Sequence, residues 1–272
     1  MAGKSPVGKP DLDRLRVRFG KDGRLAYLGH LEVINTIERS VRRASLPFSV
    51  GNGFARRIRI QFSQALPVGA ASCCEYFDLY LTERIDEAEA FERLVAATPK
   101  AMAPTRVAYV GGRLPALEAW LTRSDWTVRL TGEGEAFSAA RLDEALASLR
   151  EAGHIDFMRG DKPRTIGLEN TLVSWLAQDG PDDGPWKTIA LSLQTRSSNL
   201  GALRPQVLLE AAFGQPMLAG ANLDALRVMR IAQCHEDEAG ELVDPLDARL
   251  LVSAKDSACL VELASGTPTS CM

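Results

Sequence analysis

Residues 14–20 alternate strictly between arginine and apolar side chains, and this alternation constrains the fold more than any other feature of the chain. The apolar positions are Leu15, Val17 and Phe19, and the arginines are Arg14, Arg16 and Arg18. A period of two is typical of a strand that buries one face of a sheet. We therefore expect the three arginines to point away from the hydrophobic core.

The segments that follow have helical and strand periodicity in turn. We expect a helix over 30–44, strands over 57–62 and 75–81, a helix over 86–97, and a strand over 106–110. The resulting order is strand-helix-strand-strand-helix-strand, which is the ferredoxin-like arrangement.

The second half of the chain repeats this order more faintly. We expect strands over 126–130, 186–195 and 223–232, helices over 138–152 and 204–213, and a hairpin-like region within 154–178. Ser138 and Pro205 are typical residues for the starts of these two helices. The sequence therefore predicts an α+β fold with two tandem ferredoxin-like halves.

The expected organisation has four parts. Residues 1–13 are expected to be a disordered leader, 14–113 the first ferredoxin-like domain and 120–235 the second. Residues 236–272 are acidic at first and then rich in serine, threonine and alanine, which predicts a poorly ordered tail.

Positive charge is concentrated in the first third of a chain whose net charge is −3. Between positions 14 and 62 there are eleven lysines and arginines against three acids, a local balance of +8. The first thirteen residues are neutral, so the remainder carries −3 − 8 = −11. Such asymmetry predicts a region that faces a polyanion. It also fits a dipolar pattern that aids solubility, or an acidic face that docks the basic one internally.

The predicted strands place arginines and tyrosines on the sheet face that the two helices leave uncovered. This predicted face consists of Arg14, Arg16, Arg18, Arg56, Arg57, Arg59, Tyr76 and Tyr80. Guanidinium groups suit phosphates and aromatic rings suit stacked bases, so the face predicts RNA binding. The alternative is that the face packs on the second half and pairs its arginines with acids there.

One group of residues could carry acid–base chemistry. His30 is expected where a loop enters the first helix, near Tyr27 and Lys21. A histidine so placed could serve a metal-independent ribonuclease, or it could cap the helix or orient the Gly51-Asn52-Gly53 loop.

Several classes of protein lack support in the sequence. No stretch is long and apolar enough for a transmembrane helix, no secretory signal precedes the first domain, and we expect no membrane partner. Five cysteines form no paired framework, so a cytoplasmic location is expected. No Walker, dinucleotide-binding or zinc pattern is present, and no three cysteines are spaced for an iron–sulfur cluster. We therefore expect no cofactor and no metal.

Two stretches of the chain resemble a known family. The first runs from Phe19-Gly20-Lys21 through Leu28-Gly29-His30-Leu31-Glu32, Gly53-Phe54 and Leu66-Pro67-Val68-Gly69 to Glu75. The second is Gly201-Ala202-Leu203-Arg204-Pro205. Together they resemble the radical-SAM-associated (radical-SAM-linked) family of unknown function over about residues 14–235. The resemblance implies a protein encoded beside, or fused behind, a radical-SAM enzyme.

Three functions follow from these patterns. The first is an accessory protein of a radical-SAM enzyme that binds RNA, or an RNA–protein assembly, through the arginine face. The second is a protein–protein adaptor without affinity for nucleic acid. The third is a metal-independent RNA endonuclease that uses His30. The absence of cluster cysteines and of a recognisable catalytic motif favours the non-enzymatic functions.

Overall fold

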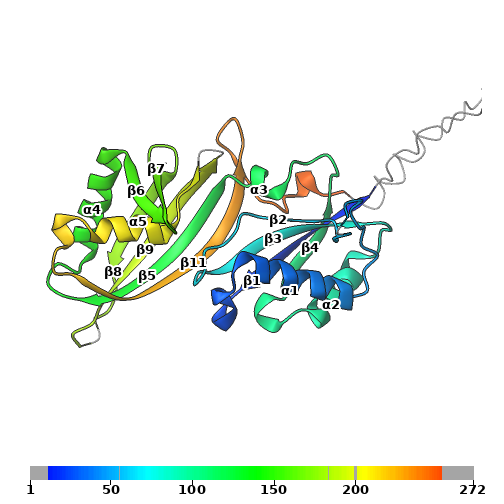
Figure 1. Cartoon of the computed structure of the whole chain (residues 1–272), viewed down its shortest axis with the longest axis horizontal. Helices are drawn as coiled ribbons and strands as arrows, with labels where there is room; N and C mark the ends of the chain where they lie inside the picture. Colours follow the sequence, from blue (N-terminus) through cyan, green and yellow to red (C-terminus); the bar gives the residue numbers. More distant parts are fainter. Residues whose placement is uncertain (1–11, 55, 183, 199–200, 253–272) are drawn as a thin grey trace, which may run out of the picture.

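The computed structural model describes residues 12–54, 56–182, 184–198 and 201–252. The molecule is elongated, with two groups of strands and helices side by side (Figure 1). The expected leader at 1–13 lies almost entirely outside the described residues, as does the expected tail beyond position 252. No helix in the described part is long and apolar enough to span a membrane.

The first half has strands on one layer and two helices on another. Its elements are β1 (Asp13–Lys21), α1 (His30–Arg43), β2 (Ile60–Phe62), β3 (Ala71–Leu81), α2 (Glu87–Ala97) and β4 (Pro104–Val110). The neighbouring strands run in the order β4-β1-β3-β2, and every pair is antiparallel. The expected strand over 57–62 is shorter than predicted, because the chain before Ile60 makes only isolated bridges.

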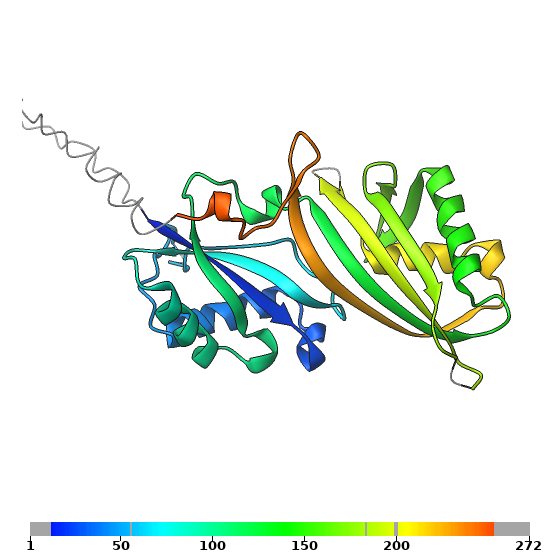
Figure 2. The same cartoon turned by 180° about the vertical axis from the view of Figure 1, so that it is seen from behind.

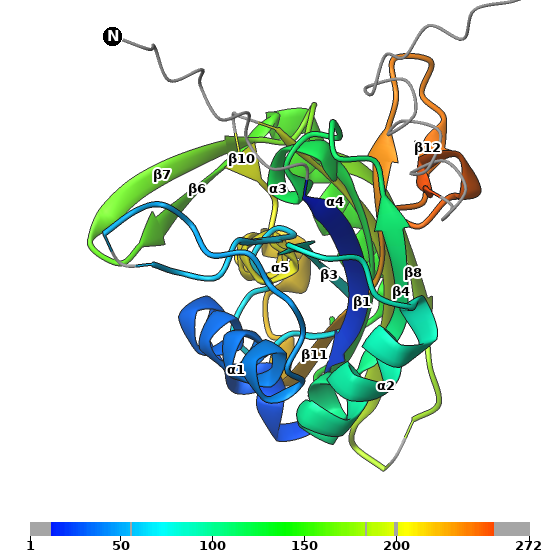
Figure 3. The same cartoon turned by 90° about the vertical axis from the view of Figure 1, so that its right-hand side faces the viewer.

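The second half has the same order of main elements, interrupted by a hairpin. Its elements are β5 (Arg123–Glu133), α4 (Ala139–Ala152), β6 (His154–Arg159), β7 (Lys162–Gly167), β8 (Leu172–Asp179), β9 (Lys187–Ser198), β10 (Gly201–Ala202), α5 (Pro205–Phe213) and β11 (Asn222–Glu236). Its main strands lie in the order β8-β9-β5-β11, again antiparallel. Strands β6 and β7 form a two-stranded sheet of their own, which arches away from the main sheet beside α5 (Figure 3).

The two halves share one mixed sheet. Strand β11 pairs with β3 in parallel through Met229 with Ala71 and Arg230 with Ser72. This short pairing joins the strands into a sheet of ten strands within the described part of the chain. The fold is therefore mixed α+β, with a single large sheet across both halves.

Each half has its own hydrophobic core between sheet and helices. In the first half, Ile37 and Val41 of α1 are buried with Leu15 and Val17 of β1, as the two periodicities predict. Each such side chain contributes about 1.5–3 kcal/mol when fully buried. In the second half, α4 and α5 pack on β5 and β9 through a separate cluster of leucines.

Gly132 of β5 marks a close approach in the second half. A Cβ atom at this position would lie 2.2 Å from the carbonyl oxygen of Asn222 and 2.3 Å from the ring of Phe137. Phe137 is fully buried, and the Asn222 carbonyl belongs to β11, which pairs with β5. Only glycine fits here without moving the β5–β11 pair.

The other face of the first-half strands is covered, which corrects the expectation of an open face. Helix α3 (Leu117–Trp120) and the chain around β12 (Leu242–Val243) pack on it. Figures 1 and 2 show α3 and this orange-red segment opposite α1 and α2. Part of the segment 237–252, where we expected a poorly ordered tail, packs on this face: Val243 and Leu246 are buried, and Leu251 bridges to Val110.

Candidate anion-binding cleft

The central arginines of the predicted face are buried. Arg14 is 2% exposed and Arg16 is not exposed at all, and both bind the fully buried Asp78 of β3. Nε of Arg14 lies 2.7 Å from Oδ2 of Asp78, and Nε of Arg16 lies 2.8 Å from Oδ1. We call Arg14, Arg16 and Asp78 the buried arginine cluster.

Backbone carbonyls complete the buried arginine cluster. Arg14 donates to the carbonyl of Pro115 at 2.8 Å, and Arg16 donates to that of Pro245 at 2.9 Å. Arg16 also lies over the ring of Trp120, at 5.3 Å from its centroid. Buried charges persist only when they are paired and hydrogen-bonded. These two arginines therefore hold the connection between the halves and the C-terminal segment against the sheet.

The rest of the predicted face is divided between buried and exposed positions. Tyr76 is buried, and burial raises the pKa of its hydroxyl. Arg18 and Tyr80 are half-buried, whereas Arg56, Arg57 and Arg59 are exposed. The expected continuous face of arginines and tyrosines is therefore not formed.

The exposed arginines lie in and after a loop that carries two of the resemblance residues. Gly53 and Phe54 are both exposed, and the ring of Phe54 has no cover. Arg56 has a φ of 41°, in the left-handed region that non-glycine residues rarely adopt.

The three residues considered for acid–base chemistry do not form a site. His30 is exposed at the first position of α1 and packs edge-on against Phe62. Tyr27 is 71% exposed, while Lys21 is buried and donates to the carbonyl of Leu28 at 2.9 Å. Burial lowers the pKa of Lys21. Among the described residues, no hydrogen bond links any two of the three.

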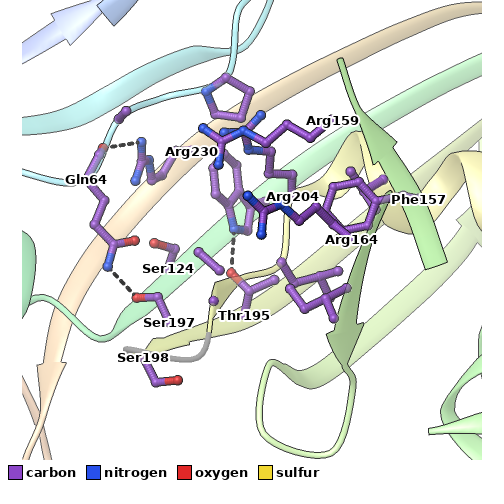
Figure 4. Close-up of a pocket in the computed structure, with 18 of the residues that line it drawn as sticks. Gln64, Ser124, Phe157, Arg159, Arg164, Thr195, Ser197, Ser198, Arg204 and Arg230 are labelled. Atoms are coloured by element: carbon purple, nitrogen blue, oxygen red, sulfur yellow. Dashed lines mark hydrogen bonds between the residues drawn. The ribbon is translucent and has the colours of Figure 1, made fainter. Parts of the chain in front are cut away.

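A cavity lies where the two halves meet the β6–β7 hairpin. It has a volume of about 550 Å³ and is bounded by the hairpin, the start of α5, strands β5, β9 and β11, and the chain after β2. Its side chains are drawn in Figure 4. The lining residues used below are Gln64, Ser124, Trp126, Phe157, Arg159, Arg164, Thr195, Ser197, Arg204 and Arg230. We call this cavity the cleft.

Three arginines at one side of the cleft have no partner in the described part of the chain. Arg159 and Arg164 come from β6 and β7, and Arg204 precedes α5. All three are exposed, and none makes an ion pair or hydrogen bond with a described residue. Their side chains enter from the same side in Figure 4. We call them the cleft arginines.

The charge of the cleft arginines is uncompensated. Burial lowers the pKa of Arg204, and the positive charge of Arg159 lowers it further. Like charges repel at short range, so their proximity is unfavourable until an anion lies between them. A carboxylate or phosphate accepts hydrogen bonds from guanidinium in a bidentate geometry. The cleft arginines thus form a candidate anion site.

Aromatic rings and one fixed arginine form the inner wall of the cleft. Nε1 of Trp126 donates to Oγ1 of Thr195 at 2.9 Å. Arg230 lies over the Trp126 ring at 4.9 Å from its centroid, and its Nε is 3.1 Å from Oε1 of Glu75. Arg230 is therefore already neutralised by Glu75, unlike the cleft arginines. Phe157 of β6 is half-buried and also faces the cleft.

The wall opposite the cleft arginines is polar and includes one acid, Glu118, whose backbone carbonyl accepts from Nε2 of Gln64 at 3.3 Å. Nε2 of Gln64 donates to Oγ of Ser197 at 2.7 Å, and the carbonyl of Gln64 accepts from Arg230. The amide oxygen of Gln64 has no hydrogen-bond partner among the described residues. Figure 4 shows Gln64 and Ser197 across the cleft from Arg159 and Arg204.

Some of the residues that carry the family resemblance line the cleft or contact its walls. Gly201, Ala202, Leu203 and Arg204 line it, and Pro205 is the first residue of α5. Pro67 lines it from the first half, and Glu75 binds its Arg230. The other resemblance residues do not line the cleft: 19–21 and 28–32 belong to β1 and the start of α1, and Gly53 and Phe54 lie on the separate exposed loop.

Sequence reasoning missed most of this site. Arg159 and Arg164 flank a glycine-containing turn within the region that we expected to be hairpin-like. The one sequence signal for this part of the site was a pair of arginines on either side of a hairpin turn. Nothing local indicated that they would meet Arg204.

The described residues offer no metal centre. No group of three or more histidine, cysteine or acidic side chains lies close enough there to hold a metal ion. Cys73, Cys74 and Cys234 are free thiols. Burial raises the pKa of Cys74 to about 12, so this thiol is not a ready nucleophile.

Comparison with known proteins identifies a family. The family described as "Uncharacterized protein conserved in bacteria (DUF2344)" matches residues 14–205, more than half of the chain. The chain belongs to this family. The DUF2344 match contains the buried arginine cluster and all three cleft arginines, while Arg230 lies beyond it. No curated protein matches the sequence.

Some solved structures resemble this DUF2344 protein at low identity. A Cbf5–Nop10–Gar1 complex is 9% identical, with a TM-score of 0.42 over 82% of this chain and 50% of that chain. This protein thus spans half the length of that relative. Ferric DtpA from Streptomyces lividans is 11% identical, with a TM-score of 0.24 over 88% and 93%. TM-scores below 0.5 do not establish a shared fold.

Proposed function

We propose that this DUF2344 protein binds RNA in the cleft and acts as an accessory protein of a radical-SAM enzyme. The observation that carries the RNA proposal is the set of three unpartnered cleft arginines beside Trp126 and Phe157. Proteins that bind single-stranded RNA combine cations for the backbone with aromatic rings for the bases. This proposal moves the binding surface from the first-half face to the cleft.

The accessory role rests on the residue resemblance. The segments that resemble radical-SAM-associated proteins border the cleft, which supports a function located there. The radical-SAM enzyme would supply the cofactor chemistry, and this chain would hold the RNA. Such a role places the protein in the cytoplasm, in keeping with its free thiols.

We also infer that the two halves are tandem ferredoxin-like domains, 14–113 and 120–235. In each half, the main strands follow the neighbour order fourth-first-third-second, which supports this inference. The β6–β7 hairpin is then an insertion that supplies two of the three cleft arginines. An experimental structure in which the two four-stranded units superpose is the expected result.

RNA binding is tested by fluorescence anisotropy with a labelled single-stranded RNA at several salt concentrations. We expect the variant R159A/R164A/R204A to lose at least tenfold in affinity. The slope of log K against log salt should flatten by about 2, since each phosphate contact on a single strand contributes about 0.7. The matched control is R56A/R57A/R59A, which removes the same charge from the exposed loop region.

Three results would reject parts of the proposal. If the control variant loses the affinity and the cleft variant keeps it, RNA binds at the first-half loop and not in the cleft. If the wild-type protein binds no RNA but forms a nuclease-resistant complex with the radical-SAM enzyme encoded beside it, the protein is an adaptor. If no such complex forms, the accessory role is wrong.

A further inference from the structure

We propose that the cleft is a single-nucleotide site, which holds the phosphate of a nucleoside monophosphate at the cleft arginines and its base against the aromatic wall. This inference rests on the proposed RNA function and specifies which part of the RNA enters. The ligand chemistry is shared by two sources, a free nucleotide and the phosphorylated end of an RNA strand.

Size limits what the cleft can contain. A volume of about 550 Å³ falls within the range of small-molecule sites, about 300–1,000 Å³. A cleft of this size accommodates one nucleotide and is too small for a duplex. Its walls come from both halves and from the hairpin, and one side is open to solvent.

The anion end of the site is defined by charge. Arg159, Arg164 and Arg204 come from three different elements and share no counter-ion among the described residues. Helix α5 begins next to Arg204 with Pro205 at its first position and no side-chain cap. The amide groups of its first turn add to the positive potential of the arginines. A phosphate satisfies these groups together.

The base end of the site is defined by flat apolar surface. Trp126 is buried with one ring face covered by Arg230, and its indole N–H is occupied by Thr195. Trp126 is only 5% exposed, so it forms the apolar floor of the base end and donates no further hydrogen bond. Phe157 comes from the hairpin and adds a second ring. Stacking on an aromatic side chain contributes about 1–3 kcal/mol per base.

The polar wall supplies hydrogen bonds for the ribose or the base edge. The amide of Gln64 is held by Ser197, which fixes its orientation and leaves its oxygen free to accept. Ser124 lines the same wall. The arginines lie on one side, and the other side carries neutral donors and acceptors together with the acid Glu118. A nucleotide can use both sides, through its phosphate and through its ribose or base, whereas inorganic phosphate or a polyanion without bases can use only the arginines.

Calorimetric titration of the full chain tests the proposal. The probes are AMP, adenosine, ribose 5-phosphate and inorganic phosphate, each at the same ionic strength. We expect AMP to bind at least tenfold more tightly than any of the other three. R159A/R204A should abolish AMP binding, and F157L should bring AMP and ribose 5-phosphate within threefold of each other. The control variant R56A/R57A should bind AMP as the wild type does.

The outcomes separate this inference from the RNA proposal. Equal binding of AMP and inorganic phosphate would show a plain anion site and overturn the inference. RNA binding without AMP binding would also overturn it, yet leave the RNA function standing. A preference of at least fivefold for 5′-phosphorylated over 5′-hydroxyl RNA would identify the RNA end as the source, and equal affinity for the two would identify the free nucleotide.

Discussion

The buried arginine cluster and the cleft arginines are made of the same residue type and are used in opposite ways. Arg14 and Arg16 are buried, share Asp78, and donate their remaining N–H groups to backbone carbonyls. Arg159, Arg164 and Arg204 are exposed and have no described partner. The difference shows that many arginines in one stretch of sequence need not form an exposed, unpaired positive surface. An arginine is unpaired only where the fold places no hydrogen-bond acceptor or carboxylate beside its guanidinium group.

The largest effect is expected from removing the acceptor of the buried arginine cluster. Asp78→Ala leaves two guanidinium groups buried without their carboxylate, and breaking a buried pair in this way costs about 3–5 kcal/mol. Urea denaturation of the variant should give a midpoint far below that of the wild type. A midpoint unchanged within error would mean that the cluster is not structural.

A similar loss of stability is expected from the close approach in the second half. Gly132→Ala puts a Cβ against Asn222 and Phe137, and overpacking of this kind costs up to about 3 kcal/mol. Gly112→Ala is the matched control, because nothing lies within 4 Å of a Cβ there. Thermal denaturation should give a clearly lower melting temperature for Gly132→Ala than for Gly112→Ala. Equal melting temperatures would show that β11 can shift away from β5.

The cleft arginines should matter little for stability. R159A/R204A removes two charges that repel each other, so the free energy of unfolding should change by no more than about 0.5 kcal/mol. The same urea titration checks this, with Arg14→Ala as the contrasting variant. A loss of several kcal/mol in R159A/R204A would make the cleft a structural feature and erase the difference between the two regions.

A pH-dependent effect concerns Glu236, an acid that pairs with two other arginines. The hydrogen bond from Arg196 lowers the pKa of Glu236 to about 2, with help from Arg123, and the ordinary value is 4.5. A carboxylate with a lowered pKa adds stability above its ordinary value, and that contribution is lost as the pH falls towards 2. Glu236→Gln should therefore be less stable than the wild type at pH 7 but equal to it near pH 2.

Melting temperatures measured from pH 2 to pH 7 test this convergence. The exposed Glu238→Gln is the matched control and should follow the wild-type profile. A constant difference between wild type and Glu236→Gln at every pH would contradict the assignment.

Local periodicity predicted most helices and strands of the fold, but not what covers them. The alternation around Val17 predicted β1 correctly, and the helical spacing around Ile37 predicted α1. The burial of Arg14 and Arg16 could not be predicted, because the elements that cover them are short. Helix α3 has only four residues and β12 only two. Elements this short leave no periodic signal, so their position over the sheet could not be predicted.

The cleft was unpredictable for a different reason. Gln64, Arg159 and Arg204 are far apart in the chain, and only the pairing of β11 with β3 and the position of the β6–β7 hairpin bring them together. Charge counting favoured the first third of the chain, where the strand arginines Arg14 and Arg16 are buried and Arg18 is half-buried. The resemblance residue Arg204 was the one cleft arginine that sequence reasoning singled out.

The central claim is that RNA occupies the cleft, and photo-crosslinking tests it most directly. Single-stranded RNA that contains 4-thiouridine is irradiated with the protein, and the modified peptides are mapped by mass spectrometry. We predict adducts in the peptides that contain Trp126, Phe157 and Arg204. Adducts confined to residues 51–62, with none at the cleft, would contradict the account.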